Sequence, residues 1–235
     1  MASKKQKNGL TEDDRINQLP DSLSRTNTSL KLRTIRLDDD DIVKLLSSCP
    51  ALETLELSMF GGFRHLEINS SNLKRLNLNF YRSFSYEEPD HVLEIFAPLV
   101  QHLELTEHFG DLKCRLVNVS SLVTANFTFN ICCTTFDDYS CREFHQVFRN
   151  LVLDSLQKLT YATEPIIGNW FAKVLFMLQL EGVPLPELRC KCLTIEVYTK
   201  FISYGVASLL RTSPFLEMLN IDMGDWCHAS NHGLA

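Results

Sequence analysis

The sequence lacks the features that would suit it to nucleic acid or a membrane. Its 23 Lys and Arg residues are outnumbered by 29 Asp and Glu residues, for a net charge of −6, so it has no basic footprint for phosphate backbones or anionic lipids. The most apolar window, residues 170–185, is interrupted by Lys173, Gln179 and Glu181 and is too polar to span a bilayer. Residues 1–18 are polar throughout, unlike a secretory signal. These absences predict a cytoplasmic or nuclear protein.

Motifs for catalysis are also missing. The chain has no Gly-rich phosphate loop, no HExxH and no GxSxG, and its seven histidines are scattered. A catalytic site would need a nucleophile with a base in reach. We therefore expect no enzyme activity and no cofactor.

The eight cysteines are expected to be reduced thiols, because disulfides are rare in the cytosol. Cys132, Cys133, Cys141 and His145 are close in sequence, but no second CxxC-type pair completes a tetrahedral site, so no metal is expected. The pair Cys190-x-Cys192 lies in a strand-like segment, where buried or half-buried structural thiols are the simplest interpretation.

What the chain does contain is a recurring apolar-x-x-apolar-x-apolar pattern. A more specific form of it occurs over residues 42–57, 92–105 and 206–221, where paired apolar residues precede Pro50, Pro98 or Pro214 and then the pattern itself. Each is predicted to be a short helix, a proline stop and a strand. The acidic run 38–41 should cap the first of these helices. The copies of the pattern begin at Leu32, Leu52, Phe63, Leu73, Val100, Leu175 and Leu216, with looser copies at Leu122, Leu156 and Cys190.

Such units predict an α/β fold, an irregular leucine-rich-repeat arc (a solenoid). One unit cannot bury its own apolar residues, so stacking should form a parallel sheet on the concave face with short helices or loops on the convex face. Gaps near Phe63 and Leu73 are too short for a helix and favour a loop or turn. Residues 130–150 lack a clear repeat and form an insertion or a longer helix. We expect a mobile tail over 1–29 and the repeat domain over 30–235.

Strand alternation divides each unit into a buried set and an outward set. The predicted core residues are Leu55, Leu57, Leu76, Leu78, Leu103, Leu105, Leu219 and Ile221. The predicted partner-binding residues of the concave face are Arg36, Glu56, His65, Glu67, Arg75, Asn77, His102 and Glu104. The same alternation places Thr34, Thr54, Thr124, Asn126, Lys158, Thr160, Met177, Gln179, Met218 and Asn220 on this face. The alternative is a solvated sheet face with the partner contacts in loops.

Two parts of the chain resemble a known family. Residues 14–23, which include Leu19-Pro20, resemble the opening of a plant F-box. Residues 45–57 (LLSSCPALETLEL), 190–195 (CKCLTI) and 205–221 (GVASLLRTSPFLEMLNI) are similar to the repeats of plant F-box/LRR-repeat proteins. The resemblance covers about residues 30–221 together with the ten-residue F-box opening.

This resemblance implies the substrate-recognition subunit of an SCF-type E3 ubiquitin ligase, in which the F-box binds a Skp-type adaptor and the repeats hold the protein to be ubiquitylated. Only Leu19, Pro20 and Leu23 match the adaptor-binding part, because the sequence passes into the repeats soon after Ser24. We therefore expect impaired adaptor binding. The alternative is a stand-alone leucine-rich-repeat interaction or decoy protein with no role in ubiquitylation.

Overall fold

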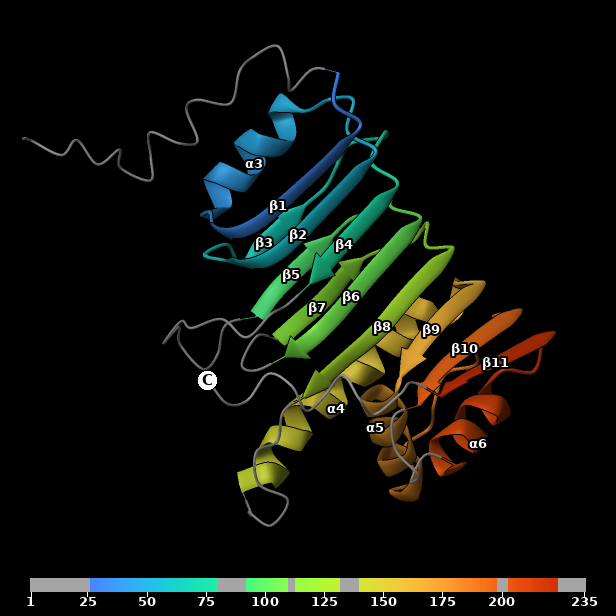
Figure 1. Ribbon diagram of the computed structural model, residues 1–235. Coiled ribbons are helices and arrows are strands. Elements are labelled where there is room, and N and C mark those ends of the chain that lie inside the picture. Colours follow the sequence, from blue (N-terminus) through green and yellow to red (C-terminus); the bar gives the residue numbers. More distant parts are fainter. Residues whose placement is uncertain (1–25, 80–91, 110–112, 132–139, 198–202, 224–235) are drawn as a thin grey trace, which may run out of the picture.

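The computed structural model describes residues 26–79, 92–109, 113–131, 140–197 and 203–223. Its main element is an eight-stranded sheet in which all the neighbouring strands are parallel. The strands in sheet order are β1 (Ser29–Arg36), β2 (Thr54–Gly61), β4 (Arg75–Asn79), β6 (His102–Phe109), β8 (Thr124–Ile131), β9 (Glu164–Gly168), β10 (Cys192–Val197) and β11 (Met218–Met223). Figure 1 shows them side by side in an open arc, which confirms the predicted leucine-rich-repeat class.

One hydrogen-bond arrangement recurs at the start of each strand of the large sheet after β1. The carbonyl of Thr28 accepts the N–H groups of both Glu53 and Thr54, and the carbonyl of Glu53 in turn accepts those of Lys74 and Arg75. The same double acceptance continues at the carbonyls of Lys74, Gln101, Val123, Thr163 and Lys191. These repeated contacts hold successive coils in one register, so equivalent positions form rows across the sheet.

The second layer begins with a helix and continues as a small sheet. Helix α3 (Asp39–Ser48) packs against β3 (His65–Glu67), which pairs with β5 (Val92–Phe96), which pairs with β7 (Lys113–Asn118). Between β2 and β8 the chain therefore alternates strictly between a strand of the large sheet and a strand of the small one.

Toward the other end of the arc the second layer is helical (Figure 1). Helix α4 (Ser140–Lys158) packs against β7 and against α5 (Asn169–Leu180). Helix α5 in turn packs against α6 (Ser203–Thr212). A 3₁₀ turn, Leu159–Tyr161, links α4 to the strand β9. Gly205 permits the close approach of α6 to α5, because a Cβ there would lie 2.5 Å from the Ala172 carbonyl oxygen.

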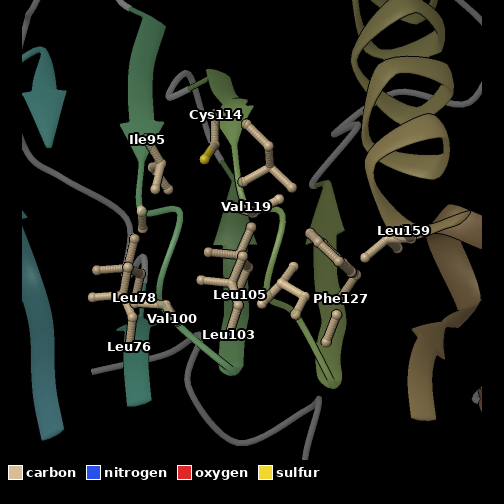
Figure 2. Packing of buried hydrophobic residues seen from close by; sticks show 14 of the residues in the cluster. Leu76, Leu78, Ile95, Val100, Leu103, Leu105, Cys114, Val119, Phe127 and Leu159 are labelled. Carbon is tan, nitrogen blue, oxygen red and sulfur yellow. The ribbon is translucent and has the colours of Figure 1, made fainter. Parts of the chain in front are cut away.

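The core fills the space between the two layers. Figure 2 shows Ile95 and Cys114 of the small sheet near Leu76, Leu78 and other side chains of the large sheet. Six of the eight predicted core residues are at most 2% exposed, which confirms this part of the prediction: Leu55, Leu57, Leu76, Leu78, Leu103 and Leu105. In the helical half, the rings of Phe127 on β8 and Phe171 on α5 meet at 5.8 Å between centroids.

The prediction of Leu219 and Ile221 as core residues is wrong. Both align with fully buried residues of β10, namely Leu193 and Ile195. Yet Leu219 is 36% exposed and Ile221 51% exposed, because β11 is the last strand of the sheet and no further described strand lies beyond it.

Three element assignments also need correction. The segment Val92–Phe96, predicted as helix, is strand β5, since Leu93 and Ile95 are buried and the residues beside them are half-buried. The pattern starting at Leu175, predicted as strand, lies in α5, where spacings of three and four residues place buried side chains on one helix face. The pattern at Leu156 lies in the end of α4 and the 3₁₀ turn, and the strand follows later as β9.

Local predictions of the first repeat are partly confirmed. Asp38 caps α3, because its side chain accepts the N–H of Asp41 at 2.8 Å. The copy of the pattern at Phe63 does contain a strand, β3, but this strand belongs to the small sheet and not to the large one. In β1, Leu30 and Leu32 align with Leu55 and Leu57, where Ile35 and Leu37 were predicted, so the predicted repeat beginning at Leu32 is out of register by five residues.

Candidate protein-binding face

We call the face of the large sheet that is turned away from the second layer the open face. Parallel strands in register place equivalent outward residues in rows across it. One row contains Thr54, Arg75, His102, Thr124 and Glu164, and the next contains Lys31, Glu56, Asn77, Glu104 and Asn126. The residues between these rows along each strand are the buried leucines and their equivalents. The open face is thus a nearly continuous polar surface supported by an apolar core.

Five of the eight predicted binding residues lie in these two rows: Glu56, Arg75, Asn77, His102 and Glu104. The structure also places Thr54, Thr124 and Asn126 there, as predicted. It adds Lys31, whose ammonium group contacts the Glu56 carboxylate at 2.5 Å. The sequence could have revealed Lys31 if Leu30 and Leu32, instead of Ile35 and Leu37, had been taken as the fourth and sixth positions of the first repeat.

The predicted placement of Arg36 beside this set is wrong. Lys31, not Arg36, is the residue opposite Glu56, and Arg36 is opposite Gly61 at the end of β1. Between them, Thr34 has a φ of 57° and the neighbouring Met59 of β2 has a φ of 53°. These two left-handed residues interrupt the regular alternation, which extrapolation along the strand could not anticipate.

The predicted placement of His65 and Glu67 on the concave face is also wrong, since both lie on β3 of the small sheet. There His65 lies between two carboxylates, with Nδ1 3.3 Å from Asp39 Oδ2 and Nε2 3.6 Å from Glu94 Oε2. Asp39 Oδ1 also accepts the backbone N–H groups of Arg64 and His65, at 2.7 and 2.9 Å. These contacts join α3 to the small sheet, on the side of the molecule opposite the open face.

Four further residues are not where alternation predicted them. Lys158 lies in the last turn of α4 and Thr160 in the following 3₁₀ turn. Met177 and Gln179 lie on α5. Their strand assignments failed, and the open-face positions belong to Glu164 and Ile166 of β9 and to Cys192, Thr194 and Glu196 of β10. Met218 and Asn220 do lie on the terminal strand β11, in register with Cys192 and Thr194.

Electrostatics differ among the polar groups of the open face. Burial raises the pKa of Glu104, and the nearby carboxylates of Glu56 and Glu196 raise it further. Burial lowers the pKa of His102, Arg75 lowers it further, and Glu164 opposes the change. His102 Nδ1 lies 2.6 Å from Thr124 Oγ1, a hydrogen bond whose direction depends on the tautomer. The side-chain oxygen of Asn126 is buried and has no hydrogen-bond partner.

The described groups of the open face are those of a polar binding surface. The ring of His102 forms a hydrogen bond with the Thr124 hydroxyl. Within the described ranges, no three His, Cys, Asp or Glu side chains are grouped so that they could hold a metal ion. What the face offers is charged and amide groups that a partner could desolvate and pair, which suits recognition.

The described thiols at Cys49, Cys114, Cys190 and Cys192 are all free. Burial raises the pKa of Cys114 to about 12, so this thiol stays protonated at neutral pH. The remaining four cysteines, including the sequence cluster Cys132, Cys133 and Cys141 near His145, have side chains outside the described part. So do Leu19, Pro20 and Leu23, the residues that resemble an adaptor-binding segment.

Comparison with known proteins agrees with this architecture. Residues 27–128 match the family model for the LRR repeats of the FBD-associated F-box protein At5g56370. The F-box/LRR-repeat protein At5g02910 of Arabidopsis thaliana is 34% identical over 198 residues, which are 82% of this chain and 40% of that protein. The repeats of this chain are similar to those of plant F-box/LRR-repeat proteins. No solved structure gives a match.

Another family member from Arabidopsis thaliana, At3g03360, is 28% identical over 194 residues, which are 82% of this chain and 38% of that protein. The chain thus spans about two fifths of the length of these F-box/LRR-repeat relatives. The family model covers α3 and the part of the arc from β1 into β8, which includes the whole small sheet. Among the helices that the structure describes, none is long and apolar enough to cross a membrane.

Proposed function

We propose that the arc is the partner-binding module of an F-box/LRR-repeat protein and that it holds a protein substrate of an SCF-type ubiquitin ligase on its open face. The observation that supports this most is the half-buried carboxylate of Glu104, which lies in a polar row across the sheet and has no ion pair among the described residues. A half-buried charge lies at a free energy cost until a partner pairs with it.

The names of the family members support the ligase part of the proposal, because they are F-box proteins. In this chain the adaptor contact would rest on Leu19, Pro20 and Leu23. A segment this short cannot hold a helix by itself in water, since nucleation is costly. Two apolar side chains contribute roughly 1.5–3 kcal/mol each when fully buried, against an association cost of at least about 4 kcal/mol. We therefore propose that the chain as given binds the adaptor weakly.

Two bulky substitutions on the open face test substrate binding. Asn77→Trp and Thr194→Trp place large neutral side chains on β4 and β10, where both residues are partly exposed. The matched control is Lys44→Trp with Val117→Trp, on α3 and β7 of the second layer, where both residues are exposed. Both double variants are expected to fold, as circular dichroism would show. Proteins captured by the wild-type chain should be lost from the open-face variant and kept by the control.

Retention of every captured protein by the open-face variant would contradict the proposed binding face. A separate pull-down with purified Skp-type adaptor decides between the ligase subunit and the stand-alone binding protein. Micromolar or tighter binding that is lost with Leu19→Ala would contradict the proposed weakness of the adaptor contact. Absence of ligase subunits together with retained substrate capture would favour the stand-alone protein.

A further inference from the structure

The open face is divided by charge along the arc. The outward residues of β1, β2 and β4 include the cations Lys31, Arg33 and Arg75 and one carboxylate, Glu56, which is already paired with Lys31. The strands β6, β8, β9, β10 and β11 contain no Lys or Arg at all. Their outward carboxylates are Glu104, Glu164, Glu196 and Asp222. One end of the face is therefore basic and the longer remainder acidic.

Two carboxylates of the acidic part, Glu104 and Glu164, are not neutralised by a cation in the part of the chain that the structure describes. Neither has an ion pair with a Lys or Arg among the described residues, whereas Glu56, Glu94 and Glu217 each contact a cation at 3.3 Å or less. The like-charged neighbours of Glu104 raise the free energy of the unbound face, and the Glu104 carboxylate is also half-buried. A cationic partner would relieve this repulsion, and an anionic one would increase it.

The spacing of the carboxylates indicates the form of the partner. Glu104 on β6 and Glu164 on β9 are separated by two strand steps, through β8, and lie in adjacent rows. At about 4.8 Å a strand step and about 6.6 Å between rows, the separation is roughly 12 Å, which an extended chain covers in about four residues. A segment lying across the strands would therefore bring one cation to each carboxylate if its Lys or Arg residues were about four positions apart.

We propose that the open face binds an extended protein segment whose Lys or Arg residues lie over β6–β11 and whose acidic residues lie over β1–β4. This inference rests on the proposed function, because it names the chemistry of the partner that the arc would hold. The observation that carries it is the charge division along the rows. A nucleic acid or an anionic membrane would meet repulsion over most of this face.

Two synthetic peptide pools serve as probes. In the basic pool two Lys residues four positions apart are fixed and the other positions are random uncharged residues; in the acidic pool Glu replaces both Lys. Fluorescence anisotropy at low salt measures their binding to the full chain. The basic pool should bind at least about tenfold more tightly than the acidic pool, and the preference should weaken as salt screens the charges.

Charge reversal locates the effect. Glu104→Lys with Glu164→Lys should weaken binding of the basic pool by at least about tenfold. The control, Glu53→Lys with Glu187→Lys, changes the net charge equally at exposed positions in loops and should change affinity by less than about twofold. Glu104→Gln with Glu164→Gln keeps the side-chain shape, so it protects the test against misfolding, and it should give an intermediate loss.

Tighter binding of the acidic pool, or an equal loss in the control variant, would overturn this inference. The proposed function fails by a different result, which is continued substrate capture by the Asn77→Trp, Thr194→Trp variant. If that variant loses its substrate but the two peptide pools bind alike, the face binds a partner without charge selection. The two failures are therefore distinguishable.

Discussion

The two halves of the second layer cover the same large sheet with different elements. From β2 to β8 the chain crosses the second layer three times, as the strands β3, β5 and β7. From β8 to β11 it crosses three times again, and each crossing contains a helix, α4, α5 or α6. Both halves support the same continuous parallel sheet with the same hydrogen bonds at the strand starts. The large sheet therefore does not determine which element covers it.

The spacing of the buried residues differs between the two halves. On β5, Leu93 and Ile95 are buried and their neighbours are half-buried, a period of two. On α5 the buried residues Phe171, Val174, Leu175 and Leu178 follow spacings of three and four. A strand inserts one row of side chains into the core, while a helix inserts a wider stripe. The helical half therefore depends more on large side chains and on close helix contacts.

Of the substitutions considered, Phe171→Ala in the helical half is expected to cause the largest loss of stability. The Phe171 ring is fully buried against Phe127, and its removal should cost about 3–5 kcal/mol of unfolding free energy. Ile95→Ala, at a fully buried position of the small sheet, should cost about 2–5 kcal/mol. Urea denaturation measures the losses, and hydrogen exchange should locate each in its own half of the arc.

The control for both is Leu219→Ala on the exposed strand β11, which should cost less than about 1 kcal/mol. Equal losses at Leu219 and at the two buried positions would mean that burial in this structure does not reflect the core. Loss of exchange protection spread evenly over both halves would mean that the two halves unfold as one unit.

Gly205→Ala tests the helix contact that has no counterpart in the small sheet. The added Cβ would lie 2.5 Å from the Ala172 carbonyl oxygen, so α6 must move away from α5 at a cost of about 1–3 kcal/mol. Thermal denaturation is the measurement. Arg211→Ala on the exposed side of α6 is the control and should change stability by less than about 0.5 kcal/mol. No loss at Gly205 would mean that the helices are not in close contact.

Asp38→Ala affects the one helix that belongs to the first half, α3. Its side chain caps the helix by accepting the N–H of Asp41, and loss of such a cap costs about 0.5–2 kcal/mol. Asp40→Ala removes a charge from the same turn without removing a cap, so it should cost less. Equal effects of the two substitutions in urea denaturation would show that the charge, not the cap, stabilises α3.

Asp39 should give the smallest effect, visible through pH. Burial alone would raise the pKa of Asp39, but the N–H groups of His65 and Arg64 and the His65 ring together hold it below its usual value. The contribution to stability is therefore present above pH about 3.9, the value expected for an unfolded Asp, and is lost as pH falls through the lower folded value. Wild type and Asp39→Asn should differ in stability at pH 6, and this difference should shrink as pH is lowered below about 3.9. A constant difference over this range would exclude an ionised Asp39.

The strand pattern in the sequence was sufficient for the class of fold, because the rows of buried leucines follow directly from it. It did not distinguish the segment starting at Leu175, which belongs to α5, from a strand, since spacings of three and five residues satisfy both patterns over a short window. It also missed the small sheet, because the sequence near Phe63 and over Val92–Phe96 does not indicate which layer the segment joins. That choice depends on tertiary structure, not on local propensity.

For the candidate site, prediction succeeded where the strands are regular. Alternation placed four residues correctly, because they alternate with leucines that are in register on neighbouring strands: Arg75, Asn77, His102 and Glu104. It failed for Arg36, beyond the left-handed residue Thr34, and for His65, whose short strand belongs to the other sheet. The charge division along the arc could not be seen before the strand order placed Glu164 and Glu196 on the same part of the sheet as Glu104.

We propose that a protein partner binds to the open face and not to the second layer. The most direct test is a photocrosslinking amino acid introduced at Asn77 on the open face, and separately at Val117 on the small sheet, in the chain expressed in plant cells. The account predicts a specific crosslinked partner from position 77 that is absent from position 117, detected by mass spectrometry. Crosslinking from position 117 alone, or equally from both positions, would contradict it.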